Sequence, residues 1–389
     1  MYLMGFQETA AERALRAELR DYFGRLRDEL GLTHKTAPGE DAPAFRAAVR
    51  RLGQDGWLGI GWPKEYGGQG RSARDQFVMF DEVQRAGFPF PFVTVNTVGP
   101  TLMRFGTEAQ KQRFLPGILA GDINFAIGYT EPGAGTDLAS LRTSARLDGD
   151  TWIVNGSKVF TSGANQADFI WLACRTEPDA PKHRGISMLL VPTDAAGFRC
   201  TPIVTVGDIV TSATYYDDVR VPDENLVGGR GEGWRMITTQ LNHERVGLAA
   251  LGGPAWRLWG DVRAWARETG RADLPWVRAD LAECYARLEA MKLLNGQMVE
   301  AIAEERLQPQ EASAAKVYGT ETHVFVYRKL LGILGAAGWL RPGSPGAALY
   351  GDVERYARSA QINTFGGGVN EVQREIVAAA GLGMVRRPR

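Results

Sequence analysis

Four segments in the first third of the chain contain apolar residues at the three- and four-residue spacing of a helix face. These segments are residues 12–30, 44–52, 74–85 and 108–119. The stretches between them are polar or rich in glycine and proline, which is typical of loops. We therefore predict a helical N-terminal domain over residues 1–120.

The pattern changes near Gly121, where short runs of β-branched and aromatic residues replace the helical spacing. These runs are residues 151–154, 168–175, 185–192 and 213–222. The dipeptides Asp148-Gly149 and Asn155-Gly156 flank the first run and predict two hairpin turns. No helical segment separates the runs, so we expect an antiparallel β domain over residues 121–230 and no alternation of strands with helices.

Helical spacing returns at Trp234 and continues almost to the C-terminus. The predicted helices cover about 234–267, 276–306, 311–337 and 346–361, with a short one from Asn370. Long helices with short links indicate a four-helix bundle over residues 231–389. The expected fold class is α+β and multidomain, with a helical domain, a middle antiparallel β domain and a C-terminal four-helix bundle.

Composition and charge restrict the kind of partner. The 389 residues suggest two or three domains. Because 45 Lys and Arg residues balance 45 Asp and Glu residues, we expect no nucleic acid or membrane partner, but small molecules or proteins. No apolar run approaches the ~18 residues of a spanning helix, and the N-terminal residues do not resemble a signal peptide. Three dispersed cysteines fit neither disulfides nor zinc, so we expect a cytoplasmic protein.

A carboxylate interrupts an apolar stripe in the first C-terminal helix. The stripe consists of Ile237, Leu241, Leu248 and Leu251, and Glu244 occupies the seventh position after Ile237. Burial of an unpaired carboxylate is costly, and it raises the pKa towards the range of a useful general base. The pattern alone leaves a structural ion pair with an arginine of a neighbouring helix as the alternative.

Three other segments have weaker local signals. Residues 130–137 combine small residues with hydroxyls, which can bind phosphate or form a plain β-turn. In residues 160–163 an aromatic ring beside hydroxyls can face a flat cofactor or pack into the core. The run Gly366–Gly368 can widen a cavity or form a loop. No P-loop, zinc-protease or strand-borne dinucleotide motif is present in the sequence.

Five segments, taken in order along the chain, resemble the acyl-CoA dehydrogenase family. They are GWPKEYGGQG (61–70), YTEPGAGTD (129–137), NGSKVFTSG (155–163), DVRVP (218–222) and NEVQRE (370–375). The resemblance extends over nearly the whole chain and implies the same α–β–α architecture. It also implies FAD as cofactor, oxidation of an acyl-CoA thioester between Cα and Cβ, and electron-transfer flavoprotein as electron acceptor.

The resemblance also implies a set of flavin contacts. They are Tyr129, Thr130, Gly135, Thr136, Phe160 and Ser162. In the family, the position of Thr130 bonds the flavin pyrimidine edge and that of Thr136 the pyrophosphate. Phe160 stands where most members have a tryptophan packed on the isoalloxazine, and Ser162 would bond near flavin N5. The protein would position the flavin, and the flavin would accept the hydride.

The catalytic base differs from the majority pattern. Most members place their catalytic glutamate just before the final helix, where this chain has Gly367. The isovaleryl- and long-chain-type enzymes place it on the first bundle helix instead, and the matching residue is Glu244, with Arg245 to orient it. The apolar stripe and the resemblance thus indicate the same base. Gly366–Gly368 would leave room in the acyl pocket for a ring system.

Two motifs that complete the FAD site across the usual family dimer are missing. Residues 267–271 and 332–336 lack the phenylalanine, glutamine and second glycine of those motifs. We therefore infer a different, homologous partner subunit. Through residues 240–246 and 364–374 the chain resembles the base-bearing subunit of actinobacterial steroid side-chain acyl-CoA dehydrogenases, which are α2β2 heterotetramers. The alternatives are an acyl-CoA oxidase on the same fold and a non-catalytic structural partner subunit.

Overall fold

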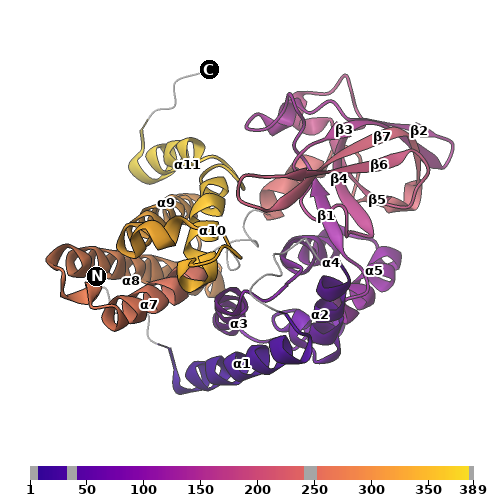
Figure 1. Cartoon of the computed structure of the whole chain (residues 1–389). Helices are drawn as coiled ribbons and strands as arrows, with labels where there is room; N and C mark the ends of the chain where they lie inside the picture. The colour runs from indigo at the N-terminus through magenta and orange to yellow at the C-terminus, as the bar shows by residue number, and fades with distance from the viewer. Residues whose placement is uncertain (1–7, 33–41, 241–251, 385–389) are drawn as a thin grey trace.

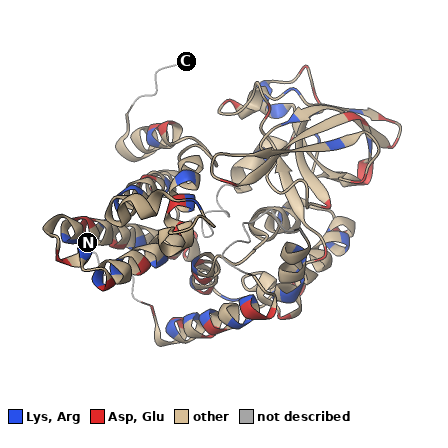
Figure 2. Cartoon of the chain, viewed as in Figure 1, with Lys and Arg blue, Asp and Glu red and all other residues tan. Residues whose placement is uncertain are grey.

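The computed structural model describes residues 8–32, 42–240 and 252–384. Figure 1 shows the strands together at one end of the molecule, next to the helices of the N-terminal region and beside a bundle of C-terminal helices. Figure 2 shows basic and acidic positions interleaved along these helices, in keeping with the balanced charge of the sequence. The predicted fold class is confirmed.

The N-terminal region is helical, as the spacing of apolar residues predicts. Its helices are α1 (Ala10–Glu29), α2 (Ala42–Gln54), α3 (Ala73–Ala86), α4 (Gly99–Phe105) and α5 (Glu108–Ala120). Reciprocal capping boxes start α1, α3 and α5, with Thr9, Ser72 and Thr107 as the capping residues. The short helix α4 has too few residues for a periodic signal and was not predicted.

Eight strands form one sheet in the middle of the chain. They are β1 (Phe125–Gly128), β2 (Ser144–Asp148), β3 (Thr151–Lys158), β4 (Phe169–Arg175), β5 (Ile186–Pro192), β6 (Phe198–Val204), β7 (Val210–Pro222) and β8 (Leu226–Val227). Their order is β6-β7-β3-β2-β4-β5-β8, with β1 beside β4. The pairs are antiparallel except that β1 and β2 each run parallel to β4. Both strands reach β4 through intervening chain, which a parallel pair requires.

The two faces of the sheet have different neighbours. Side chains alternate between faces along a strand, so Trp171, Met188 and Leu190 all point the same way. These three join the hydrophobic core of the N-terminal helices. Alternate residues such as Leu172 and Leu189 belong to a separate core on the other face. The sheet is therefore fixed on the helical region through β4 and β5.

One of the two predicted hairpin turns is present and the other is wrong. Asp148-Gly149 forms the turn between β2 and β3, and Gly149 has a φ of +66°. Asn155-Gly156 lies inside β3, where the register with β7 shifts between Val154 and Gly156. This is a β-bulge in which Asp217 and Asp218 of β7 stand opposite Asn155 of β3, and Gly156 has a φ of +142°. Local turn chemistry cannot distinguish a bulge from a hairpin when the strand has a long partner.

The C-terminal region is a helical bundle. Residues 233–240 are helical, followed in the described chain by α7 (Gly253–Glu268), α8 (Pro275–Ala303), α9 (Pro309–Leu334), α10 (Asp352–Ser359) and α11 (Asn370–Ile376). Residues from α7, α8, α9 and α10 share one hydrophobic core. The helix predicted over 346–361 is α-helical only in α10, with 3₁₀ turns on both sides. Within the described residues, no helix has the length and apolar character to cross a membrane.

Contacts of Arg358 join the β-sheet to the bundle. Arg358 at the end of α10 forms an ion pair with Asp208 and donates a hydrogen bond to the carbonyl of Val206, both in the β6–β7 loop. Gly207 of the same loop is so close to Ser359 that a Cβ would lie 2.8 Å from the Ser359 Cα. The β6–β7 loop is thus held against the segment that leads to the glycine run.

Candidate active site

Tyr129 and Thr130 follow β1 and lie against two other elements of the site. The backbone N–H of Val159 donates to the Thr130 carbonyl at 2.8 Å, which joins this segment to the end of β3. The Tyr129 hydroxyl accepts a hydrogen bond from the Trp171 indole at 3.0 Å and donates to the side chain of Gln240. Gln240 is buried in the helix 233–240. The segment therefore contacts both the sheet and the first C-terminal helix.

A buried ion pair supports the loop that begins at Thr130. Lys158 at the end of β3 donates to the Glu131 carboxylate at 2.8 Å and to the Tyr129 carbonyl at 3.0 Å. Glu131 also accepts from the backbone N–H groups of Arg142 and Thr143. Burial alone would raise the pKa of the Glu131 carboxyl, but the Lys158 charge and these donors outweigh it and lower the pKa. Glu131 therefore stays ionised and holds the loop.

The far side of this loop is open. A tight turn pairs Glu131 with Ala134, and Gly135 and Thr136 after it are exposed. Within the described chain, no hydrogen bond uses the backbone N–H of Gly135 or Thr136. Exposed amides beside a hydroxyl fit an anionic phosphate group.

Phe160 and Ser162 form the neighbouring turn. Phe160 has a φ of +60° and its side chain is 62% exposed, which is unusual for a bulky residue. Such a conformation persists only where the surroundings impose it. Here the N–H of Thr161 donates to the Ser212 carbonyl at 2.9 Å, and the hydroxyls of Ser162 and Thr211 are 3.0 Å apart. The start of β7 thus holds an aromatic ring in an open position that fits a flat ring system.

These two turns bring together the six residues predicted as flavin contacts. The Val159–Thr130 hydrogen bond joins the turns, with the open amides on one and the exposed aromatic ring on the other. The set of donors and the exposed ring fit a dinucleotide that has both a pyrophosphate and an isoalloxazine. The residues present therefore fit FAD.

The glycine run follows α10, which contains Arg358, through residues 360–364. Gly366, Gly367 and Gly368 are exposed, and the last two have φ values of +65° and +98°. A Cβ at Gly367 would have no heavy atom within 4 Å, so the loop borders open space at this position. In the described residues the Gly367 N–H has no hydrogen-bond partner.

Lys316 on α9 holds both ends of the glycine loop. Its ammonium donates to the carbonyl of Thr364 at 3.3 Å and to that of Gly368 at 2.6 Å. It also donates to the side chain of Asn370 at 2.7 Å, and Asn370 is buried against Thr320. Burial lowers the pKa of Lys316 to about 8, although Glu371 and Glu321 oppose this shift. Sequence patterns did not identify Lys316, because its partners lie about fifty residues away.

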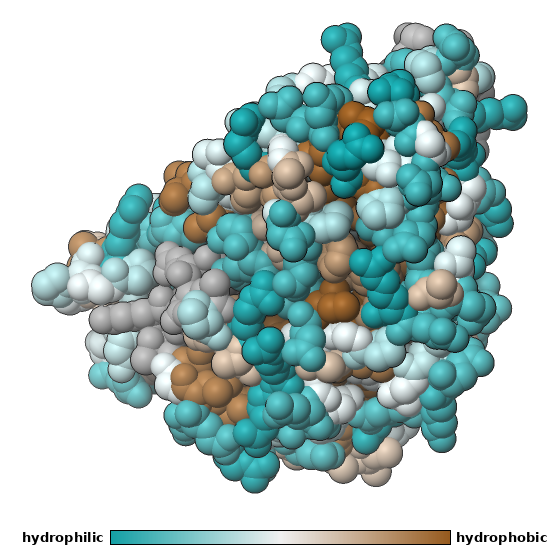
Figure 3. Space-filling model, turned by 90° about the vertical axis from the view of Figure 1, so that its right-hand side faces the viewer, coloured by the Kyte–Doolittle hydropathy of each residue, from teal (hydrophilic) through white to brown (hydrophobic). Residues whose placement is uncertain are grey.

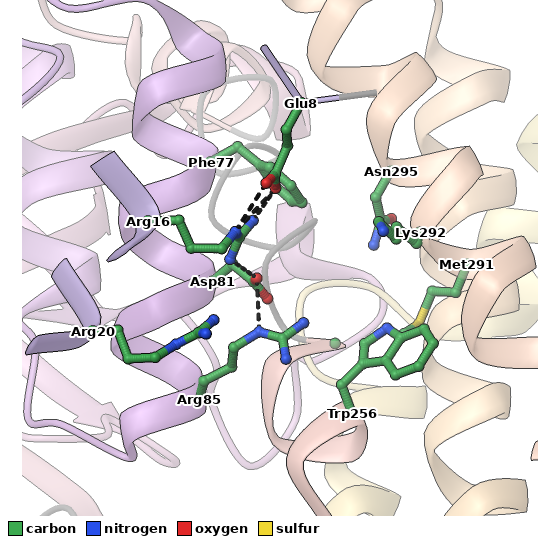
Figure 4. A pocket seen from close by; sticks show the side chains of 11 residues that line it. Glu8, Arg16, Arg20, Phe77, Asp81, Arg85, Trp256, Met291, Lys292 and Asn295 are labelled. Carbon is green, nitrogen blue, oxygen red and sulfur yellow. Dashed lines mark hydrogen bonds and ion pairs between the residues drawn. The ribbon is translucent and has the colours of Figure 1, made fainter. Parts of the chain in front are cut away.

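One cavity lies beside this loop, and a larger one adjoins that cavity. The smaller, about 60 Å³, lies between α8, α9 and the loop, and Gly366, Gly367, Lys316 and His323 are among the residues that line it. The larger, about 250 Å³, lies between the N-terminal helices and the bundle. Figure 4 shows Arg16 and Asp81 on one wall of it and Trp256, Met291 and Asn295 on the other. Gly252, Met291 and Asn295 line both cavities.

Glu244 and Arg245 lie outside the described residues, so the structure does not place the predicted base. The described part of the helix before them ends at Gln240, and Ile237, the first residue of the apolar stripe, is buried. Gln240, Lys316 and His323 are site residues that sequence patterns missed. The sequence does contain one indication of Lys316 and His323: they are polar residues seven positions apart, which places them on one face of α9.

Family models match almost the whole chain. The acyl-CoA dehydrogenase N-terminal domain matches residues 9–122, the middle domain residues 126–219, and the C-terminal domain residues 231–382. Among curated proteins, the acyl-CoA dehydrogenase FadE26 of Mycobacterium tuberculosis is 49% identical, over 99% of this chain and 100% of its own length.

Solved structures are similar over the same extent. A structure described as the Tcur3481-Tcur3483 steroid ACAD superposes with a TM-score of 0.95 at 62% identity, covering 99% of this chain and 100% of the other. The ChsE4-ChsE5 complex from Mycobacterium tuberculosis superposes with a TM-score of 0.91 at 49% identity, covering 98% of this chain and 99% of the other.

Proposed function

The chain belongs to the acyl-CoA dehydrogenase family and is an oxidoreductase that dehydrogenates acyl-CoA, and we propose that it uses FAD, acts on a bulky steroid side-chain acyl-CoA, and is the base-bearing subunit of a heteromeric enzyme. The product would be the trans-2-enoyl-CoA. The observation that carries the proposal is the open glycine at position 367, where most of the family has its catalytic glutamate.

We assign the role of base to Glu244. It follows Gln240 by four residues, so the helix predicted over 234–267 would place both on one face. Gln240 contacts Tyr129 at the edge of the proposed flavin site, which supports placing the base near the reacting carbons. Glu244 would remove the α-proton of the acyl-CoA, and Arg245 would orient its carboxylate.

FAD, when bound, would accept the β-hydride of the substrate. Thr130 and Ser162 would orient its ring, Phe160 would cover one side of the ring, and Gly135 and Thr136 would bind its pyrophosphate. The Lys158–Glu131 pair would keep the phosphate loop in shape without touching the cofactor.

The Gly367 amide would polarise the thioester oxygen. It is exposed, it has no hydrogen-bond partner in the described chain, and Lys316 fixes the loop around it. A donor already fixed in place stabilises the enolate-like charge as it develops, with little reorganisation. This role needs the loop to be rigid, and Lys316 serves as its positioning residue.

A bulky acyl group suits this loop. Side chains are absent from residues 366–368, and the smaller cavity adjoins the loop and shares Gly252, Met291 and Asn295 with the larger one. The solved structure at 62% identity is named a steroid ACAD, which supports a steroid-bearing acyl group as the substrate here. The proposed electron acceptor is electron-transfer flavoprotein.

A heteromeric assembly suits the missing motifs. Residues 267–271 and 332–336 lack the side chains that complete the FAD site in the family dimer. Two similar structures are named as pairs of chains, ChsE4-ChsE5 and Tcur3481-Tcur3483. We propose an α2β2 heterotetramer in which the homologous subunit provides the missing contacts.

The role of Glu244 is tested by Glu244→Gln. We expect kcat to fall by about 10²–10⁴-fold, the usual contribution of a general base, while the FAD absorbance of the purified complex stays unchanged. Glu108→Gln is the matched control, because Glu108 has a side chain that is 78% exposed. Retained turnover in Glu244→Gln would contradict the assignment.

Co-expression with homologous subunits tests the assembly and the reaction type. Native mass spectrometry should show two kinds of subunit, and a homotetramer with four FAD would exclude the proposal. Turnover of linear, branched and steroidal CoA esters identifies the substrate class. Peroxide release without an added electron acceptor would favour the oxidase alternative.

A further inference from the structure

The smaller cavity beside the glycine loop has a polar wall that a hydrocarbon chain does not require. Lys316, Gly319, Thr320 and His323 of α9 line it at positions that recur on one helix face. Asn295 of α8 lines the opposite side. An entirely apolar acyl group would gain nothing from these side chains and would desolvate them.

His323 differs from the other polar residues of this wall. Lys316 and Thr320 donate hydrogen bonds to backbone carbonyls, and Asn295 also has a partner. The His323 side chain is buried, only 4% exposed, and among the described residues its Nε2 atom has no hydrogen-bond partner. A buried polar atom without a partner is uncommon in folded proteins and indicates a missing ligand atom or water.

The imidazole is suited to a neutral, oxygen-bearing ligand. Burial lowers the pKa of His323 to about 4, so the ring is uncharged at neutral pH. A neutral imidazole has one donor and one acceptor nitrogen, which suits a hydroxyl or keto oxygen and not an anion. The cavity of about 60 Å³ is large enough for such a substituent.

We propose that this cavity is a subsite for a hydroxyl or keto group on the acyl part of the substrate, and that His323 is the residue that recognises it. The inference rests on the proposed function, because the glycine loop that borders the cavity is the loop assigned to the thioester. It adds that the acyl group bears oxygen close to the reacting carbons. A water molecule held by His323 is the competing occupant.

The test compares two acyl-CoA esters with the same carbon skeleton, one with a hydroxyl group near the reacting carbons and one without. Both are assayed with the full complex, by binding and by kcat/KM. The wild type should prefer the hydroxylated ester. His323→Phe should lose about 10–100-fold in kcat/KM for that ester, the usual effect of removing one hydrogen bond in a closed site, and change little for the other.

The matched control is Thr322→Val. Thr322 is also buried, with a hydroxyl that lacks a partner in the part of the chain that the structure describes, but it does not line the cavity, so the preference should stay unchanged. His323→Leu serves if the phenylalanine does not fit. Since either change removes an unsatisfied polar group, the melting temperature should not fall.

The outcomes separate the subsite from the proposed function. A preference that is absent in the wild type, or unchanged in His323→Phe, means that water occupies the cavity and overturns the subsite. Failure of the complex to bind or oxidise any acyl-CoA would refute the proposed function, and the subsite with it.

Discussion

Two lysines, Lys158 and Lys316, hold the two loops of the candidate site. Lys158 is fully buried and bonds Glu131 and the Tyr129 carbonyl beneath the first loop. Lys316 is partly buried and bonds the carbonyls of Thr364 and Gly368 at the two ends of the second. In both cases the lysine ammonium holds the backbone of a loop whose glycines have no side chains to fix it.

Lys158→Met should strongly destabilise the protein. It leaves the Glu131 carboxylate buried without its counter-charge, and breaking a buried pair in this way costs about 3–5 kcal/mol. Chemical denaturation measures the free energy of unfolding, and the FAD content should fall with it. Lys182→Met is the control, since its pair with Asp137 is exposed and contributes at most about 1 kcal/mol. Equal effects of the two changes would refute a structural role of the buried pair.

Lys316→Met should impair catalysis more than folding. The loop loses the charged donor that fixes the Gly367 amide, and kcat/KM should fall about tenfold, the effect of one charge-assisted hydrogen bond. Steady-state kinetics measure this, with FAD absorbance as the check that the cofactor stays bound. Lys316→Arg should recover part of the activity because it keeps a charged donor. Full activity in Lys316→Met would show that the loop needs no such anchor.

At the scale of elements, a β-bulge between β3 and β7 lies close to the end of β3 that reaches the site. Lys158 is the last residue of β3, two residues after Gly156, which borders the bulge. Two hydrogen bonds join Asn155 and Asp218 across the bulge. The Asn155 side-chain amide donates to the Asp218 carboxylate, and the Asp218 backbone N–H donates to the Asn155 side-chain oxygen. The bulge thus has a defined geometry, and only glycine adopts its backbone conformation easily.

Gly156→Ala should therefore destabilise the protein by more than about 2 kcal/mol, as expected where both strain and a clash arise. Its Cβ would lie 2.7 Å from the Thr143 Cα, at a φ of +142°. Gly149→Ala in the β2–β3 turn is the control. That site has open space, so only the cost of a positive φ applies, about 1 kcal/mol. Thermal unfolding of both variants gives the comparison, and a mild effect at Gly156 would contradict the bulge.

For the whole molecule, the site depends on contacts between regions distant in sequence. Arg358 joins α10 to the β6–β7 loop, and β7 in turn holds the turn with Phe160 and Ser162. The same α10 leads to the glycine loop through residues 360–364. On the face shown in Figure 3, apolar surface occurs in patches separated by polar residues.

Arg358→Ala should increase local opening both in the β6–β7 loop and in the segment that leads to the glycine loop. It removes the partner of Asp208 and Glu354, and Glu354 is buried. Hydrogen–deuterium exchange should rise in residues 205–209 and in residues 360–368 together, because local opening reports the loss of shared contacts. Arg51→Ala is the control, since it breaks only exposed ion pairs in the N-terminal region. Faster exchange on one side alone would refute the coupling.

The sequence alone was enough to predict most helices and strands and to recognise the family. Apolar spacing predicted α1, α3, α8 and α9 within a few residues, because a helix face or a strand face is a property of short stretches of chain. The motifs YTEPGAGTD and NGSKVFTSG identified the segments that lie side by side in the structure. The assignment of Glu244 as the base stays a prediction.

The tertiary structure decided what joins these segments. The Asn155-Gly156 signal reads as a turn in isolation, but the long pairing of β3 with β7 makes it a bulge. Lys316, His323 and Arg358 acquire their roles from partners or a cavity formed by distant parts of the chain. Periodicity and turn chemistry report interactions over a few residues, whereas these contacts depend on how whole elements pack. For that physical reason the sequence determined the parts of the site, and only the fold determined how they meet.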